Sequence, residues 1–372
     1  MLTMLPSAPK SLGRLGEVLI SALHSVQGKS NSLALPARKS VCVILIDGLG
    51  VSNIKSAAGH ASFLNSQHSE PAMCWFPATT ATSITSFATA SSPWENGFLG
   101  YQVFDRQENI TMNLLSGWAS QEDGEKYQSI QTLSELGLSQ GIGFHVVAPS
   151  AYEKSGFTAA TMRSATFHGT DRISERFTKA LELLKDSEPK VVYLYIPELD
   201  QLAHAQGSAS TAWLNQMEDV DSELRLFVSA VPKSSGVLMT ADHGLVDVPK
   251  ENHIYIDEII DGEDFEFVGG DTRSLFVYFK QGIDQEPLRT KLEAHLSDSC
   301  YISTPAEIVA AGYWRTLSPK SENVAPDFII LARKKVALYH RGFAKAKSLE
   351  MVGHHGSITN EELAIPLIRF GF

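Results

Sequence analysis

The sequence predicts an α/β fold in which helices sandwich a doubly wound, mostly parallel β-sheet. Its strongest apolar runs have the length of strands and are unbroken, which is typical of strands buried on both faces of a sheet. Segments of helix length separate these runs, and alternating strands and helices indicate parallel strand pairing. In chain order the runs read VCVILI, GIGFHVVA, KVVYLYI and GVLMTA.

The first 35 residues are expected to form a helical lead-in to this sheet. Apolar residues recur there at helical spacing, which predicts an amphipathic helix packed on the core. No basic leader precedes a continuous apolar stretch, and no run approaches the roughly 18 apolar residues of a membrane span. The recurring positions are Leu12, Leu15, Leu19, Leu23 and Val26.

The strand pattern changes after residue 250. Shorter and more alternating strands follow, with one helix candidate at DQEPLRTKLEAHL. A chain of 372 residues exceeds one average domain, so it could be one large α/β domain with insertions or two domains. We therefore predict a catalytic core formed by residues 36–250 and 350–372, with a smaller α+β subdomain inserted at 251–349.

Composition excludes several classes of partner. The chain is 43% hydrophobic and 20% charged, with mean hydropathy near zero, as in ordinary globular proteins. A net charge of -11 argues against polymeric nucleic acid or an anionic membrane as partner. A small phosphorylated molecule, such as a nucleotide, remains compatible if metal ions supply positive charge. The oligomeric state does not follow from these numbers.

The cysteines indicate a reducing compartment, so we expect a cytoplasmic location. Their count is odd and their spacing is not that of a metal site. They are Cys42, Cys74 and Cys300.

Acidic and imidazole side chains follow three of the predicted strands. Asp47 follows VCVILI, Asp200 follows KVVYLYI, and Asp242 with His243 follows GVLMTA. Ligands of open α/β sheets bind outside the carboxyl ends of the strands, so these groups are expected at one edge. Taken alone, Asp47 could equally be a turn residue or a helix cap.

Two further motifs complete a candidate metal site. Asp200 and His204 are four residues apart, which places both on one face of a helical turn. His355 lies in VGHHGS near the end of the chain. Separately these pieces could be a solvated helix face, a tight turn and an exposed loop. Together they could hold two divalent cations, most simply zinc, with manganese or iron as substitutes. The six candidate ligands are Asp47, Asp200, His204, Asp242, His243 and His355.

A hydroxyl-rich run provides a candidate nucleophile. The stretch FPATTATSITSFATA has the pattern of a helix that begins near Thr80. A metal-bound hydroxyl at a helix N-terminus would be partly deprotonated, and the helix end would favour a phosphate. The alternative is a Ser/Thr-rich helix that only packs.

In order and spacing, LIDGLG, FPATTATSITSFATA, DQLAHAQG, ADHG and HHGS resemble the alkaline phosphatase superfamily, above all its type I phosphodiesterase/nucleotide pyrophosphatase branch. The resemblance covers roughly residues 40–250 and the final twenty or so. It implies an alkaline phosphatase-like core and a phosphothreonine intermediate on Thr80 rather than Thr79. It assigns one zinc to Asp200, His204 and His355, and the other to Asp47, Asp242, His243 and Thr80.

The sequence also departs from the family pattern. An asparagine that holds a phosphate oxygen in well-known members is replaced by Tyr101, and the usual Phe-Pro-Asn after the threonine is absent. We therefore name Tyr101 and Arg273, in GGDTRS, as candidate substrate contacts. Arg273 could equally be a surface arginine of a hairpin. The resemblance makes His354 a structural neighbour of the site.

Three functions are compatible with these motifs. The favoured one is hydrolysis of phosphodiester or nucleotide pyrophosphate bonds. The second is another reaction on the same fold, by a phosphomonoesterase or a phosphonate hydrolase. A formylglycine sulfatase is excluded, because CWFPA lacks the required Cys-x-Pro-x-Arg core. The third is a non-catalytic metal-binding relative.

Overall fold

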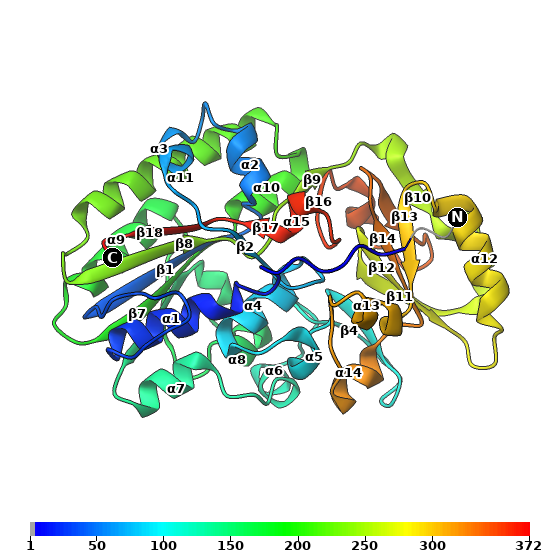
Figure 1. Cartoon of the computed structure of the whole chain (residues 1–372), viewed down its shortest axis with the longest axis horizontal. Helices are drawn as coiled ribbons and strands as arrows, with labels where there is room; N and C mark the ends of the chain where they lie inside the picture. The colour runs from blue at the N-terminus through cyan, green and yellow to red at the C-terminus, as the bar shows by residue number, and fades with distance from the viewer. Residues whose placement is uncertain (1–3) are drawn as a thin grey trace.

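The computed structural model describes residues 4–372. The larger part of the structure is built around a six-stranded sheet with the order β18-β8-β1-β7-β5-β6 (Figure 1). All neighbours pair in parallel except β18, which runs antiparallel to β8. The strands span Ser40–Ile46 (β1), Gly143–Ala148 (β5), Thr166–Gly169 (β6), Lys190–Ile196 (β7), Ser235–Thr240 (β8) and Leu367–Phe370 (β18).

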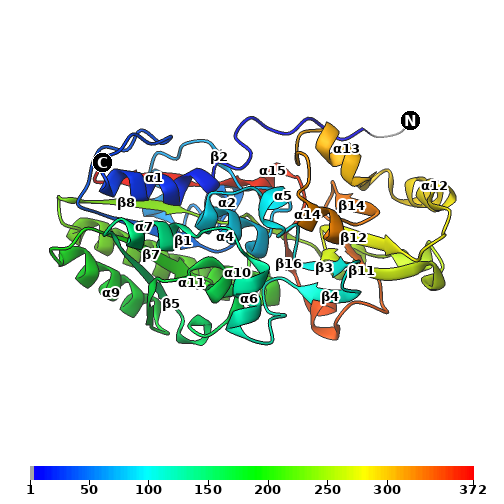
Figure 2. The same cartoon turned by 90° about the horizontal axis from the view of Figure 1, so that it is seen from below.

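Helices cover both faces of this sheet, as Figure 2 shows in side view. α1 and α4 pack on one face, and α9 and α11 lie against the other. The expected lead-in helix forms as α1, with Leu15, Leu19 and Leu23 fully buried. The main helices are α1 (Gly16–Val26), α4 (Thr80–Thr89), α7 (Leu133–Ser139), α9 (Ile173–Lys185), α10 (Glu198–Gln206) and α11 (Thr211–Ala230).

Short helices and strands connect these elements. The helices are α2 (Val51–Ser56), α3 (Ser62–Ser66), α5 (Pro93–Asn96), α6 (Gln121–Tyr127), α8 (Gly156–Thr161) and α15 (Asn360–Leu363). The strand pairs are β2 (Ala72–Met73) with β17 (Ala364–Ile365), β3 (Gln102–Asp105) with β4 (Ile110–Asn113), and β9 (Val246–Asp247) with β16 (Gly353–His354).

A second, antiparallel sheet has the order β11-β12-β14-β13 and its own buried apolar cluster. Its elements are β11 (Phe265–Asp271), β12 (Ser274–Phe279), α12 (Gln285–Leu296), β13 (Cys300–Ser303), α13 (Pro305–Ala310), α14 (Pro319–Val324) and β14 (Phe328–Ala332). β15 (Ala337–Tyr339) pairs with β10 (His253–Tyr255) beside it. The exact division between core and subdomain stays a prediction.

The two sheets share packing contacts. Trp314, which follows α13, is fully buried in the main core and donates its indole N–H to the carbonyl of Phe76 at 3.0 Å. The β3–β4 hairpin of the larger part lies against β11 of the smaller sheet. The smaller sheet is therefore held close to the carboxyl ends of the main strands. Within residues 4–372, none of the helices combines the length and apolar character needed to span a membrane.

Candidate metal centre and phosphoryl pocket

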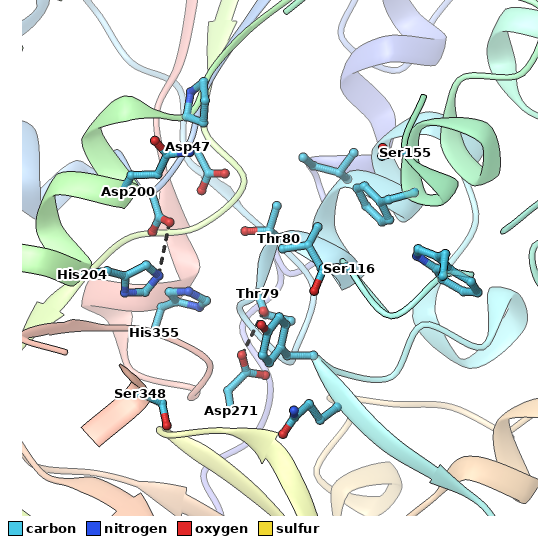
Figure 3. A pocket seen from close by; sticks show the side chains of 18 of the residues that line it. Asp47, Thr79, Thr80, Ser116, Ser155, Asp200, His204, Asp271, Ser348 and His355 are labelled. Carbon is cyan, nitrogen blue, oxygen red and sulfur yellow. Dashed lines mark hydrogen bonds and ion pairs between the residues drawn. The ribbon is translucent and has the colours of Figure 1, made fainter. Parts of the chain in front are cut away.

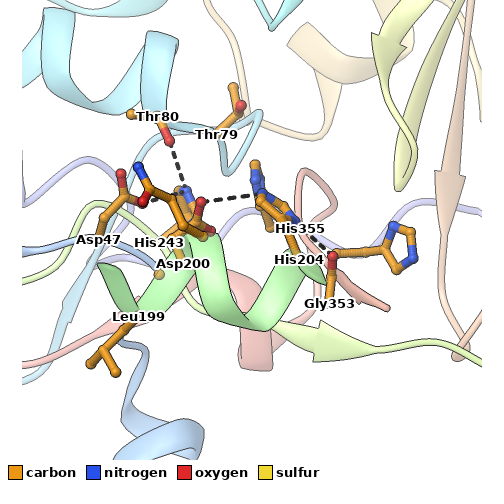
Figure 4. Close-up of polar contacts among 12 residues, drawn as sticks. Asp47, Thr79, Thr80, Leu199, Asp200, His204, His243, Gly353 and His355 are labelled. Atoms are coloured by element: carbon orange, nitrogen blue, oxygen red, sulfur yellow. Dashed lines mark hydrogen bonds and ion pairs between the residues drawn. The ribbon is translucent and has the colours of Figure 1, made fainter. Parts of the chain in front are cut away.

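The order of the central strands brings the predicted carboxylates together. β1 lies between β7 and β8 and runs parallel to both, so the carboxyl ends of all three strands meet at one edge. Asp47 follows β1 directly, Asp242 follows β8, and Asp200 lies in the first turn of α10, just after β7. Figure 4 shows Asp47, Asp200 and His243 gathered below Thr80. The convergence expected from the strand ends is therefore present.

The ligand atoms form two compact groups of three residues. Asp47, Asp242 and His243 form one group, and all three are buried. The other joins Asp200 and His355 with His243, whereas the sequence grouping had His204 in that place. His204 still contacts this group, because its Nε2 lies 3.2 Å from Asp200 Oδ2. His243 belongs to both groups. Its ring is stacked on the ring of His355, with 3.8 Å between the two ring centroids.

Each of the three histidines has one ring nitrogen held by a main-chain carbonyl. The Nδ1 atoms of His204, His355 and His243 lie 2.8, 2.9 and 3.2 Å from the carbonyl oxygens of Gly353, Ala78 and Gly244, respectively. A carbonyl accepts a hydrogen bond from Nδ1–H, so Nε2 is the nitrogen that can bind a metal when the ring is neutral. This pattern is that of metal-binding imidazoles.

The carboxylates are crowded in a way that a cation would relieve. Within the described chain, Oδ1 of Asp47, Oδ1 of Asp200 and Oδ2 of Asp242 are buried and have no hydrogen-bond partner. Burial and the charges of Asp242 and Asp200 raise the pKa of Asp47 well above its usual value. Burial raises the pKa of Asp242 as well, with a contribution from Asp200 and against the attraction of His243. Unpartnered buried oxygens are costly, and divalent cations satisfy them. The donor set therefore fits a two-metal site.

His204 and His355 differ in their electrostatic surroundings. Burial opposes ionisation of both members of the Asp200–His204 pair, but their mutual attraction lowers the pKa of Asp200 and raises that of His204 to about 9. Burial, reinforced by repulsion from His243, lowers the pKa of His355 well below its usual value. His355 is thus neutral, as a metal ligand must be.

Thr80 begins α4, as the sequence predicted, and its hydroxyl faces the candidate metal ligands. Its Oγ1 lies 3.2 Å from Nε2 of His243. Thr79 is the N-cap residue of α4, but its side chain does not cap the helix. The N–H groups of the first turn are therefore left without the usual side-chain partner, which suits an anion.

A cavity of about 1070 Å³ opens onto these residues. Figure 3 shows Thr79 and Thr80 between the candidate ligands Asp200, His204 and His355 and the far side of this cavity. Tyr101 also lines the cavity, so its position is compatible with the substrate contact predicted for it. Aromatic side chains that line it include Trp118, Tyr152, Phe157, Tyr195 and Phe343.

Two further residues of the site were missed by the sequence reasoning. Tyr195, within β7, donates its hydroxyl hydrogen bond to Oδ2 of Asp47. Asp271, at the end of β11, accepts a 3.0 Å hydrogen bond from Thr79. The motif GGDTRS contains Asp271, yet its arginine was singled out instead. Only the fold of the second sheet brings this carboxylate to the cavity.

The prediction that Arg273 contacts a substrate is wrong. Its side chain is only 1% exposed and forms a buried ion pair with Glu362, through Nη2 to Oε2 at 2.8 Å and Nε to Oε1 at 3.2 Å. Nη1 donates to the carbonyl of Val336 at 2.8 Å. Glu362 in turn accepts from the N–H of Ser357, two residues after His355. The arginine therefore fixes the loop that carries a candidate ligand.

Replacing Arg273 by methionine is expected to lower the free energy of unfolding by about 3–5 kcal/mol, because it leaves the Glu362 charge buried and unpaired. Urea denaturation measures this change. Arg341→Met is the control, since Arg341 is about half exposed in its pairs with Asp257 and Glu258 and should cost at most about 1 kcal/mol. Equal effects of the two substitutions would contradict this role of Arg273.

His354 is fully buried beside the site and does not line the cavity. Its Nδ1 lies 2.8 Å from the hydroxyl of Thr272, and its Nε2 lies 3.2 Å from the carbonyl of Met351. Both nitrogens are thus engaged away from the metal groups.

Comparison with known proteins agrees with this geometry. The family model described as type I phosphodiesterase / nucleotide pyrophosphatase matches residues 41–358. Human ectonucleotide pyrophosphatase/phosphodiesterase 5 (ENPP5) has a similar structure, with a TM-score of 0.68, 14% sequence identity, and coverage of 89% of this chain and 87% of that one. A search of curated proteins finds no match.

Two structures of murine ENPP5 are also similar. Each match covers 89% of this chain and 87% of the murine chain. One has a TM-score of 0.68 at 16% identity. The other, an inactive variant in complex with AMP, has a TM-score of 0.66 at 15% identity. At sequence identities this low, structural similarity is evidence for the fold alone. The shared fold confirms the α/β class that the sequence predicted. With a family model that spans most of its length, the chain belongs to the type I phosphodiesterase/nucleotide pyrophosphatase family of enzymes, within the alkaline phosphatase superfamily.

Proposed function

We propose that this enzyme hydrolyses phosphodiester or nucleotide pyrophosphate bonds through a phosphothreonine intermediate on Thr80. The observation that carries the proposal is the position of the Thr80 hydroxyl at the open N-terminus of α4, 3.2 Å from His243 Nε2. A nucleophile, metal-type ligands and unpaired helix N–H groups thus face one cavity. This combination suits transfer of a phosphoryl group.

The metal ions would be held in two sets. Asp47, Asp242 and His243, with Thr80, would bind one ion, and Asp200, His204 and His355 would bind the other. Mixed carboxylate and imidazole ligands favour zinc, with manganese or iron as substitutes. When bound, the cations supply positive charge that lowers the pKa of a hydroxyl or water and neutralises phosphate oxygens.

The protein groups then have separate roles in the reaction. The Thr80 oxygen forms a bond to phosphorus while the bond from phosphorus to the leaving oxygen breaks, which gives phosphothreonine. A water oxygen next bonds to phosphorus and the Thr80 oxygen is released. The N–H groups at the start of α4 would hold the non-bridging oxygens in both steps. Tyr195 would keep the Asp47 carboxylate oriented through its hydrogen bond.

A nucleotide is the substrate class we favour. The similar murine ENPP5 was obtained in complex with AMP, as an inactive variant that carries a threonine-to-alanine substitution. The cavity here is large enough for a nucleotide and has aromatic side chains on which a base could stack. A small ligand also agrees with the net charge of -11, which disfavours polymeric nucleic acid. A cytoplasmic location stays a prediction from three cysteines, all free and buried.

The metal-loaded protein is expected to cleave bis(p-nitrophenyl) phosphate with a kcat/KM at least about tenfold above that for p-nitrophenyl phosphate, or about 1.4 kcal/mol in transition-state stabilisation. Nitrophenolate release measures both rates, and protein treated with a chelator is the control. Faster cleavage of the monoester would favour a phosphomonoesterase instead. Cleavage of neither compound would refute the proposed activity.

A further inference from the structure

Asp271 is a nearly buried carboxylate that lines the cavity beside α4, the helix that carries Thr80. The side chain is 8% exposed and lines the cavity. Its Oδ1 accepts the hydrogen bond from Thr79, and Figure 3 shows the carboxylate directed at that residue. Its Oδ2 is buried without a hydrogen-bond partner in the described chain.

The position of Asp271 is fixed from two sides. Thr79 holds it to the start of α4, immediately before Thr80. On the other side Gly356, which follows His355, packs so closely that a Cβ there would lie 2.6 Å from the Cβ of Asp271. The carboxylate therefore lies between the candidate nucleophile and a candidate ligand loop.

No cationic side chain of residues 4–372 forms an ion pair with this carboxylate. Arg273, two residues further on, is committed to Glu362. Burial without a partner is costly for a carboxylate oxygen, so a purely structural aspartate would be expected to have both oxygens paired. The negative charge of Asp271 instead lies beside the start of α4, next to Thr80, where a phosphoryl group would bind.

We propose that Asp271 selects phosphodiesters over phosphomonoesters by charge. The inference rests on the proposed function and names its substrate class more closely. A phosphodiester carries one negative charge, whereas a monoester carries close to two above neutral pH. Repulsion grows with the product of the charges and is strong in a partly enclosed site. A fixed carboxylate beside the phosphoryl pocket thus penalises the monoester more.

The test compares Asp271→Asn with the wild type, with Glu266→Gln as a matched control. Asparagine keeps the shape and the acceptor for Thr79 but removes the charge. Glu266 lies on the same strand with an exposed side chain. Burial raises the pKa of Asp271 to about 7, although the hydrogen bond from Thr79 opposes this rise. The measurements are therefore made at pH 9, where Asp271 is ionised.

We expect Asp271→Asn to raise, by about tenfold, the ratio of kcat/KM for the monoester p-nitrophenyl phosphate to kcat/KM for the diester bis(p-nitrophenyl) phosphate. In calorimetry its affinity for inorganic phosphate should rise by a similar factor, while that for dimethyl phosphate changes by less than about twofold. Glu266→Gln should alter neither quantity. Asp271→Ser is a second variant in case the asparagine disturbs folding.

Unchanged ratios and phosphate affinities in a folded, active variant would overturn the proposal. So would an equal loss of rate on both esters with phosphate binding unchanged, because that result would make Asp271 purely structural. If the wild type cleaves neither ester but phosphate affinity still rises in the variant, the role of Asp271 stands and the proposed hydrolase activity fails.

Discussion

Replacing Thr80 by alanine is expected to lower kcat for bis(p-nitrophenyl) phosphate by at least about 10⁴-fold, because it removes the atom that would bond to phosphorus. The loss should occur without a loss of metal, since three other residues remain in the same ligand set. Steady-state rates and elemental analysis of the same preparation measure the two quantities.

Thr85→Ala provides the matched control for this prediction. Thr85 lies five residues further along α4 and is also buried, but its hydroxyl donates to the carbonyl of Ala81 at 2.8 Å. Its loss should reduce stability by about 1 kcal/mol and leave the rate nearly unchanged. If Thr80→Ala retained the wild-type rate, Thr80 would have no place in the mechanism.

Replacing Asp242 by asparagine should have the next largest effect, a fall in activity of at least about 10³-fold through loss of bound metal. Asp242 is fully buried, and only its Oδ1 is paired, because it accepts hydrogen bonds from the N–H groups of Gly48 at 3.2 Å and His243 at 3.1 Å. The variant should contain fewer metal equivalents by elemental analysis.

The same substitution should have opposite effects on stability with and without metal. Without metal, Asp242→Asn removes a charge that raises the pKa of Asp47 and relieves the repulsion from Asp200 that helps to raise the pKa of Asp242, so the melting temperature should rise. With zinc, the wild type should gain up to about 4 kcal/mol at a thousandfold excess over Kd, and the variant less. Thermal unfolding with and without zinc measures both effects.

Asp219→Asn is the control for Asp242→Asn, because Asp219 is exposed. It should change neither the metal content nor the zinc-dependent gain in stability. Equal metal content and an equal response to zinc in wild type and Asp242→Asn would remove Asp242 from the ligand assignment. A fall in melting temperature without metal would instead indicate that the hydrogen bonds that Asp242 accepts from the N–H groups of Gly48 and His243 outweigh the repulsion.

The sequence by itself determined the sheet and the convergence of its strand ends. Unbroken apolar runs such as Ser40–Ile46 can be buried only as interior strands, and parallel strands present their carboxyl ends at one edge. The same local rules placed Asp200 and His204 on one turn of α10 and started α4 at Thr80. These features depend on periodicity and on neighbours along the chain, which the sequence contains directly.

Only the tertiary structure decided which residues from distant parts of the chain come into contact at the site. His355 meets His243 because β16 pairs with β9, and such a short pairing leaves little periodic signal in the sequence. Arg273 and Asp271 are separated by one residue, yet the hairpin buries the arginine against Glu362 and turns the aspartate to the cavity. Which of two polar neighbours faces a ligand depends on distant partners, and therefore on the complete fold.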